Sequence, residues 1–203
     1  DNFRIETENN PEMLFSVQAE DGWTTCAYRI YTTPRPWGGW DFHEPIQDLV
    51  DEFEEGDPRL DYSIMKPGDI IDLGGDQGPT EYTADLSSTG YHFLKFASWR
   101  ETGGLNGSQN VPVLRAADVY LMVAEAKIRR DGNGAGDSEI NAIRERAGLD
   151  PVSGAGMAEL IHERRVELSG ENQRHQDLMR WDRAGIIDIV AHYKEDRGSF
   201  KPP

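Results

Sequence analysis

The sequence is poor in cysteine and in long hydrophobic runs. Cys26 is the one cysteine among 203 residues, so no disulfide can form within the chain, which neither requires nor excludes an extracellular setting. The longest apolar stretches, such as residues 119–126, are interrupted by charge within a few residues. They fall far short of the roughly 18 apolar residues that span a bilayer. The first residues show no signal peptide or lipid-attachment cysteine, and Asp1 is not a natural translational start, so we expect a mature, trimmed or partial chain.

Positive charge is scarce in the first half of the chain. The formal net charge is −16, and residues 1–110 carry 7 lysines and arginines against 21 acids, a net charge of −14. Residues 111–203 carry 14 against 16, a net charge of −2. Because a phosphate backbone requires cationic contacts, this pattern argues against a nucleic-acid partner and favours a neutral or cationic one.

The first half reads as loop with few regular elements. Residues 12–18 alternate loosely, as a short strand does, and residues 91–96 predict a second strand. Residues 45–54 begin with proline and repeat apolar positions at helical spacing, which predicts a short amphipathic helix. Residues 19–44 and 66–90 have no helical period and are predicted to be long loops.

The second half changes to helical periodicity. Residues 113–130 repeat apolar positions at steps of 3, 4, 3 and 4, with members Leu114, Ala117, Leu121, Ala124 and Ile128. A second stripe on this segment, formed by Ala116, Tyr120 and Val123, predicts that the helix packs on two sides. Further helices are predicted after Asp137 or Ser138, around residues 157–168 and from about residue 178 onward.

These elements predict a mostly α fold with short β hairpins. The three or four helices have short connections, so they are expected to pack as antiparallel hairpins. Their lengths fit tetratricopeptide-type packing, although no exact internal repeat is present. We therefore divide the chain into a loop-rich, aromatic, ligand-facing region, 1–110, and a helical scaffold region, 111–203, both parts of one domain.

Residues 163–181, ERRVELSGENQRHQDLMRW, interleave arginines with acids and apolar residues. On helices, opposite charges at spacings of three and four form ordinary side-chain pairs. We therefore interpret this segment as a structural, salt-bridged seam between helices. A nucleic-acid contact is disfavoured because the local acids nearly cancel the arginines, and a catalytic role is the remaining alternative.

Three segments in this order resemble the SusD/RagB family of outer-membrane, surface-exposed nutrient-binding lipoproteins of Bacteroidota. They are RAADVYLMVAEA, INAIRERAGL and ELIHERRVELSGENQRHQDLMRW, and MLFSVQ, PIQDLVDEFEEGDPRLDYSI and TGYHFLKF agree with the family's middle section. The resemblance covers most of residues 12–183. Family members are usually about twice this length or more, so the chain looks like the C-terminal portion of such a protein.

The resemblance implies a binding protein and not an enzyme. Such proteins hand an oligosaccharide, or sometimes a peptide, to a SusC-like TonB-dependent transporter at the cell surface of the outer membrane. Membrane association is expected only through an N-terminal lipid anchor, which this sequence does not contain. The family implies no cofactor. It also implies that the helices form the scaffold and that loops on the other side meet the ligand.

The aromatic segment within residues 19–44 is the candidate ligand site. Sugars present flat C–H faces to which aromatic rings offer dispersion contact, and charged side chains bond their hydroxyls. The candidate ligand-binding residues are Trp23, Tyr31, Arg35, Trp37, Trp40, Asp41 and Phe42. The alternative is that the rings pack the loop onto the scaffold; it stays open for Trp37 and Trp40 and is favoured for Tyr31.

Other chemistries find little support. A glycoside hydrolase needs two carboxylates about 5–10 Å apart, which 37 acids do not exclude, but no catalytic motif is present. Calcium is conceivable at Asp69, Asp72 and Asp76, although their spacing misses the EF-hand pattern. The five histidines are scattered without ligand spacing, so we predict no metal site and no zinc.

Overall fold

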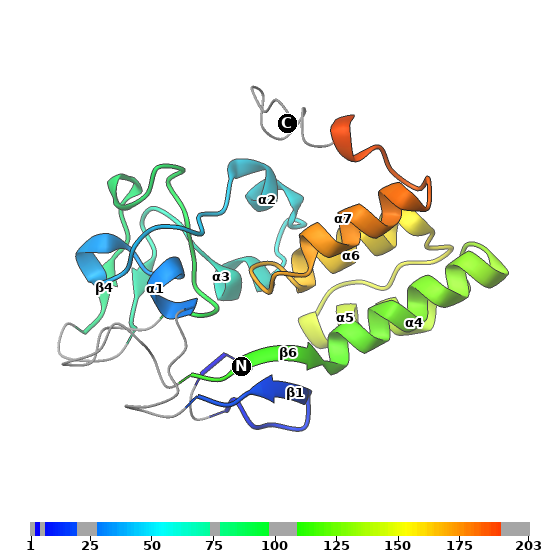
Figure 1. The fold of residues 1–203 in the computed structure, drawn as a ribbon, viewed down its shortest axis with the longest axis horizontal. Helices are drawn as coiled ribbons and strands as arrows, with labels where there is room; N and C mark the ends of the chain where they lie inside the picture. Colours follow the sequence, from blue (N-terminus) through cyan, green and yellow to red (C-terminus); the bar gives the residue numbers. More distant parts are fainter. Residues whose placement is uncertain (1–2, 5–6, 20–27, 74–77, 98–108, 192–203) are drawn as a thin grey trace.

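The computed structural model describes residues 3–4, 7–19, 28–73, 78–97 and 109–191 of the chain (Figure 1). A lobe of four longer helices lies beside a lobe of short helices, short strands and loops. A two-stranded sheet runs along one side of the molecule and leads into the first long helix. The described part of the chain is mostly helical, as the sequence predicts.

The strand β6, Val111–Arg115, precedes the helix α4, Ala116–Asp131. The periodic segment predicted to be helical from residue 113 therefore begins as a strand, and Leu114 belongs to β6 rather than to the helix stripe. The cause is tertiary: β6 pairs antiparallel with β1, Met13–Val17, with Met13 opposite Arg115. The strand predicted at residues 12–18 is thus confirmed.

Three more helices complete the helical lobe: α5 is Asp137–Ala147, α6 is Met157–Glu167 and α7 is Arg174–Arg183. Their buried core with α4 consists of Ala117, Leu121, Ala124, Ile128, Ile140, Ile143, Ala155 and Leu160. The helix α5 ends at Gly148, which adopts the left-handed conformation that glycine tolerates without steric cost. The predicted four-helix pattern is confirmed.

Only one of the two predicted stripes of α4 is covered. Leu121 and Ala124 are fully buried, whereas Tyr120 and Val123 are 47% and 41% exposed. Within the described residues, the second face of α4 therefore meets solvent.

The other lobe holds more short elements than its composition suggests. Its elements are α1 (Tyr28–Thr32), η1 (Arg35–Trp37), α2 (Gln47–Glu52), α3 (Arg59–Ser63), β2 (Ile64–Met65), β3 (Ile70–Ile71), β4 (Thr80–Glu81), η2 (Ala84–Leu86) and β5 (His92–Phe93). The loops predicted at residues 19–44 and 66–90 thus contain single helical turns and two-residue strands. Such elements are too short to leave a periodic signal.

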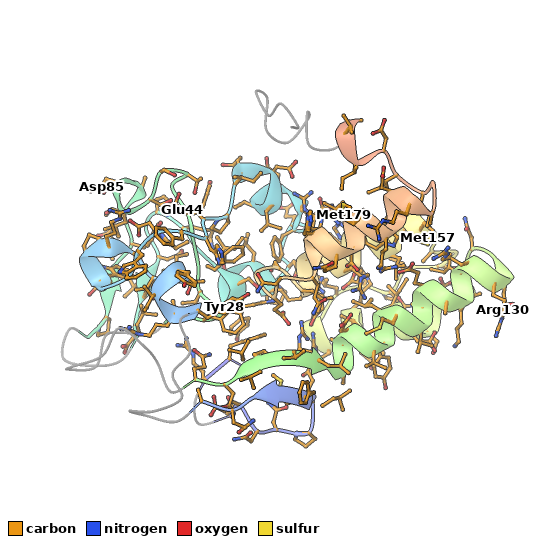
Figure 2. All side chains as sticks on the ribbon, in the orientation of Figure 1. Tyr28, Glu44, Asp85, Arg130, Met157 and Met179 are labelled. Carbon is orange, nitrogen blue, oxygen red and sulfur yellow. The ribbon has the colours of Figure 1, made fainter. Side chains whose placement is uncertain are left out.

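Two small cores hold this lobe together and attach it to the helices. One is formed by Trp37, Met65, Ile71, Tyr82 and Ala97. The other joins Phe53 and Ile64 to Val166 of α6, and so links the two lobes. Figure 2 shows side chains filling the space between the ribbons of both lobes, with Tyr28 and Glu44 in the loop lobe and Met157 and Met179 in the helical lobe.

Candidate functional site: an exposed aromatic face

The loop after η1 folds back along α1. The Trp40 amide donates to the Ile30 carbonyl at 2.7 Å, and the amides of Phe42 and His43 donate to the Tyr31 carbonyl at 3.1 and 3.0 Å. These bonds fix residues 40–43 beside the helix. The side chains of Trp40 and Phe42 are therefore presented together with that of Tyr31.

The glycine pair in the WGGW sequence makes this return possible. Gly38 has a φ of 93°, a conformation that other residues adopt only at a cost. A Cβ on Gly39 would lie 1.7 Å from the Thr33 carbonyl oxygen, so the backbones could not approach as they do. Two glycines are thus needed for two different reasons.

Tyr31, Trp40 and Phe42 form a cluster of rings that we name the aromatic face. The rings of Tyr31 and Phe42 are stacked, with centroids 5.7 Å apart and an interplanar angle of 18°. The ring centroid of Trp40 lies 5.6 Å from that of Phe42 and 6.2 Å from that of Tyr31. Trp40 is 40% exposed and Phe42 is 60% exposed, which is unusual for adjacent large rings held in fixed geometry.

The other four candidate residues are not part of the aromatic face itself. Trp37 is 5% exposed and packs edge-on against Tyr82 in the core of the loop lobe, so it adds nothing to the exposed surface. Arg35 is exposed and pairs through Nε with the Asp41 carboxylate at 2.9 Å. Trp23 lies outside the described residues. The structure therefore brings together five of the seven candidates: the aromatic face and the Arg35–Asp41 pair beside it.

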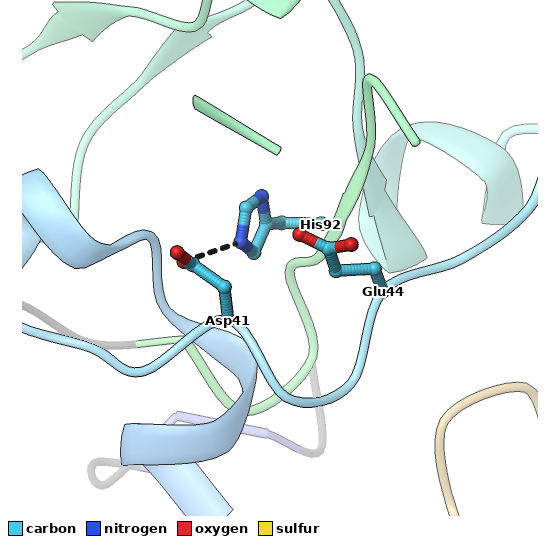
Figure 3. A group of neighbouring side chains, drawn as sticks. All are labelled: Asp41, Glu44 and His92. Atoms are coloured by element: carbon cyan, nitrogen blue, oxygen red, sulfur yellow. Dashed lines mark hydrogen bonds and ion pairs between the residues drawn. The ribbon is translucent and has the colours of Figure 1, made fainter. Parts of the chain in front are cut away.

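Asp41 lies between Trp40 and Phe42 in the chain, and its carboxylate is anchored by hydrogen bonds. Its Oδ1 accepts the Arg35 amide at 2.8 Å and lies 3.1 Å from Nε2 of His92, which is fully buried in β5 (Figure 3). On the other side of the imidazole, Nδ1 lies 2.8 Å from the hydroxyl of Tyr82. Asp41 is thus a positioning residue for the aromatic face.

The protonation states of this group follow from burial. Burial lowers the pKa of His92, and the nearby Asp41 and Glu44 carboxylates offset this only in part, so the imidazole is neutral near pH 7. Burial also raises the pKa of the Tyr82 hydroxyl, which therefore keeps its proton. Since a carboxylate only accepts, Nε2–H of His92 donates to Asp41 and the Tyr82 hydroxyl donates to Nδ1.

Sequence reasoning missed His92 and Tyr82 as parts of this site. His92 is 51 residues from Asp41 and reaches it because β5 pairs with β2, with His92 opposite Met65. A two-residue strand gives no signal from which that pairing could be predicted.

Salt bridges confirm the structural interpretation of residues 163–181. Arg164 of α6 pairs with Asp118 of α4 at 2.9 Å and with Asp177 of α7 at 2.7 Å. Trp181 is fully buried, and its Nε1 donates to Glu125 at 3.2 Å. The seam therefore ties three helices together and belongs to the scaffold.

The salt bridges of the seam also include residues outside the neighbouring helix turns from which it was predicted. Glu167 accepts from Arg115 at 2.7 Å, from Arg146 at 2.5 Å and from Arg59 at 3.2 Å. Burial opposes ionisation of Glu167, but the adjacent guanidiniums outweigh it and hold its pKa well below the usual 4.5. A carboxylate thus joins four segments that are far apart in the chain.

The candidate calcium ligands show no convergence among the residues that the structure describes. Asp69 pairs with Lys66, and Asp76 lies outside the described residues. Two other mixed groups bring three metal-ligating side chains within 4.8 Å of one another: Asp41, Glu44 and His92, and Glu54, His162 and Glu163. In the second group Arg144 pairs with both carboxylates, and Arg59 pairs with Glu163 as well.

The family model described as SusD family matches residues 11–199. The chain belongs to the SusD family. A SusD-like protein of Formosa agariphila, P25, is 42% identical over 96 residues, which are 42% of this chain and 17% of the relative. The assignment confirms the resemblance and the SusD-like fold.

Solved structures agree with the family assignment. A SusD-like carbohydrate-binding protein of Bacteroides fragilis superposes with a TM-score of 0.71 at 27% identity, covering 88% of this chain and 43% of that one. A laminarin-binding SusD-like protein superposes with a TM-score of 0.68 at 27% identity, covering 96% and 45%. The chain therefore spans less than half the length of these SusD proteins. Among the described residues, no helix has the length and apolar character needed to cross a membrane.

Proposed function

We propose that this chain is the ligand-capturing part of a cell-surface glycan-binding protein of the outer membrane, which passes oligosaccharide to a TonB-dependent transporter. The observation that carries this proposal is the aromatic face, a cluster of adjacent rings fixed by backbone hydrogen bonds and open to solvent. The carbohydrate-binding and laminarin-binding SusD relatives support the same ligand class.

The aromatic face suits the chemistry of sugars. A pyranose ring offers an apolar C–H face to Trp40 or Phe42, and its hydroxyl rim can accept hydrogen bonds from Arg35. Nε of Arg35 pairs with Asp41 at 2.9 Å, and the side chain is 69% exposed, so its guanidinium is accessible to a bound sugar. Region 1–110 would then meet the ligand and region 111–203 would provide the scaffold.

The proposed mechanism is capture and release, with no bond made or broken. A carrier must release its cargo, so we expect a dissociation constant of roughly 1 μM to 1 mM, or about −8 to −4 kcal/mol. Loss of about 50 Å² of apolar contact at one ring, at about 25 cal/mol per Å², weakens binding by about 1.2 kcal/mol, or about eightfold.

The test is a binding screen of the longest soluble form of the protein against soluble polysaccharides by affinity electrophoresis, with an assay for released reducing sugar. Phe42→Ala should weaken the retarded complex about eightfold. Phe15→Ala is the matched control, because Phe15 is the same residue type, is also 60% exposed and lies on β1. It should leave binding unchanged.

Equal effects of the two variants on binding would show that the aromatic face is not the ligand site. Release of reducing sugar would show that the protein hydrolyses the glycan rather than only capturing it. If a folded protein shows no binding across the panel but retains a peptide library component at the aromatic face, the cargo is peptide and the glycan proposal fails.

A further inference from the structure

Three metal-ligating side chains converge next to the segment that carries the aromatic face. Asp41 and Glu44 come from the loop that carries Phe42, and His92 comes from β5, as Figure 3 shows. One donor atom from each lies within 4.8 Å of the others, and the histidine is fully buried. Small side-chain movements would bring all three to the 2.0–2.2 Å bond lengths of a zinc site.

Each of the three side chains is held by a further hydrogen-bond partner outside the group. The Tyr82 hydroxyl fixes the His92 ring at 2.8 Å, and the Arg35 amide fixes Asp41 at 2.8 Å. The backbone amide and the hydroxyl of Ser88 both bond Glu44. Metal sites in proteins use outer contacts of this kind to orient their ligands.

Charge distinguishes this group from the other mixed group in the molecule. Arg35 compensates Asp41, but no cation pairs with Glu44 among the residues that the structure describes. The Glu44 carboxylate, which has no paired cation among these residues, therefore leaves the group with excess negative charge. In the group around His162, by contrast, two guanidiniums face the two carboxylates: Arg144 pairs with Glu54 and Glu163, and Arg59 also pairs with Glu163.

We propose that Asp41, Glu44 and His92 bind a divalent transition-metal ion of the zinc class. One imidazole nitrogen with two carboxylates suits zinc better than calcium or magnesium, which prefer all-oxygen sites. The metal would take the place of the proton on Nε2, and the ring proton would move to Nδ1 and be donated to the oxygen of Tyr82.

The metal would cross-link the loop of the aromatic face to β5. Asp41 lies between Trp40 and Phe42 in the chain, so fixing its carboxylate also fixes the directions of both rings. A metal ion would therefore strengthen glycan binding by pre-organising the face. This coupling rests on the proposed function, whereas metal binding itself does not.

The test is isothermal titration of chelator-treated protein with zinc chloride, with calcium and magnesium chlorides alongside. We expect one zinc ion per chain and no comparable heat from the other two ions. Glu44→Gln should weaken zinc binding by more than the roughly 10–100-fold that loss of an outer contact costs. Glu55→Gln, which removes the same charge at an exposed position, should leave it unchanged.

His43→Gln tests whether zinc instead binds at an exposed histidine, because His43 is an exposed imidazole next to the Tyr31 ring. This variant should keep the zinc site. Absence of zinc binding to folded protein, equal affinity in Glu44→Gln, loss in His43→Gln, or tighter binding of calcium would each overturn the proposal.

A glycan titration separates the two proposals. If zinc binds through Glu44 and chelation does not weaken glycan binding, the coupling is refuted while the metal site stands. If no glycan binds at all, the proposed function fails, and the zinc titration still decides the metal site.

Discussion

Replacing Glu167 by glutamine should destabilise the scaffold strongly. Its carboxylate is buried and accepts from Arg59, Arg115 and Arg146, each from a different segment. Glutamine keeps the shape of the side chain but removes the anion, so the buried guanidiniums lose a shared counter-charge.

The magnitude follows from what remains after the change. Breaking a buried ion pair by removing one partner costs about 3–5 kcal/mol. Arg59 keeps its pair with Asp57, and Arg115 keeps its pair with Glu171. The side chain of Arg146 is 41% exposed, so its share is small. We therefore expect the lower end, about 3 kcal/mol of unfolding free energy.

Urea unfolding followed by circular dichroism measures this change. With a slope of about 2 kcal/mol per molar, the midpoint should fall by about 1.5 M. Glu145→Gln on the exposed side of α5 is the control and should shift the free energy of unfolding by less than about 0.5 kcal/mol. A Glu167→Gln midpoint equal to that of the control would refute the reasoning.

The pH dependence of stability tests whether the loss in Glu167→Gln comes from the missing negative charge. The pKa of Glu167 is lowered in the folded state, so its contribution to stability is present above the usual value of 4.5 and is lost as the pH falls below it. The difference between wild type and Glu167→Gln should therefore narrow on acidification. A difference that stays constant would mean that glutamine acts through packing and not through charge.

Two further predictions concern the loop lobe and its contact with α6. Gly39→Ala should cost about 3 kcal/mol of unfolding free energy and reduce glycan binding, because its Cβ would meet the Thr33 backbone. Gly56→Ala measures the cost of left-handed backbone alone, since Gly56 has a φ of 82° and a Cβ there would meet nothing within 4 Å; it should cost about 1 kcal/mol, and equal costs would count against this account. The hydrogen bond to Glu52 raises the pKa of His162 although burial opposes it, so its stabilising effect is present at low pH and is lost as the pH rises through the folded pKa. Thermal unfolding should show His162→Gln less stable than wild type at about pH 5.5 and nearly equal at about pH 8.5, and a pH-independent gap would contradict the ion pair.

The sequence predicted the helical lobe well because its signals are local. The stripe of Leu121, Ala124 and Ile128 repeats at the helix period, and Gly148 ends α5 where a left-handed residue is needed. Leu114 misled the prediction at the start of α4, because an apolar residue at the right spacing fits a strand as well as a helix. Pairing with β1 decided between them.

The aromatic site was predicted as a segment but not as a geometry. Trp37 and Trp40 are three residues apart and have the same side chain, yet one is 5% exposed and the other 40%. Nothing in the local sequence separates them, since the difference arises from the core of the loop lobe against which Trp37 packs. The return of the chain along α1 then places Trp40 beside Tyr31 and Phe42.

The sequence alone established the family, the mostly helical scaffold, the acidic character of the first half and the segment richest in aromatic residues. These properties depend on composition and on periodicities of a few residues. Only the tertiary structure decided that His92 meets Asp41 and Glu44, and that Glu167 holds three arginines. Those contacts join residues 21 to 108 positions apart. The packing of helices, short strands and loops brings them together, and this packing leaves no local pattern in the sequence.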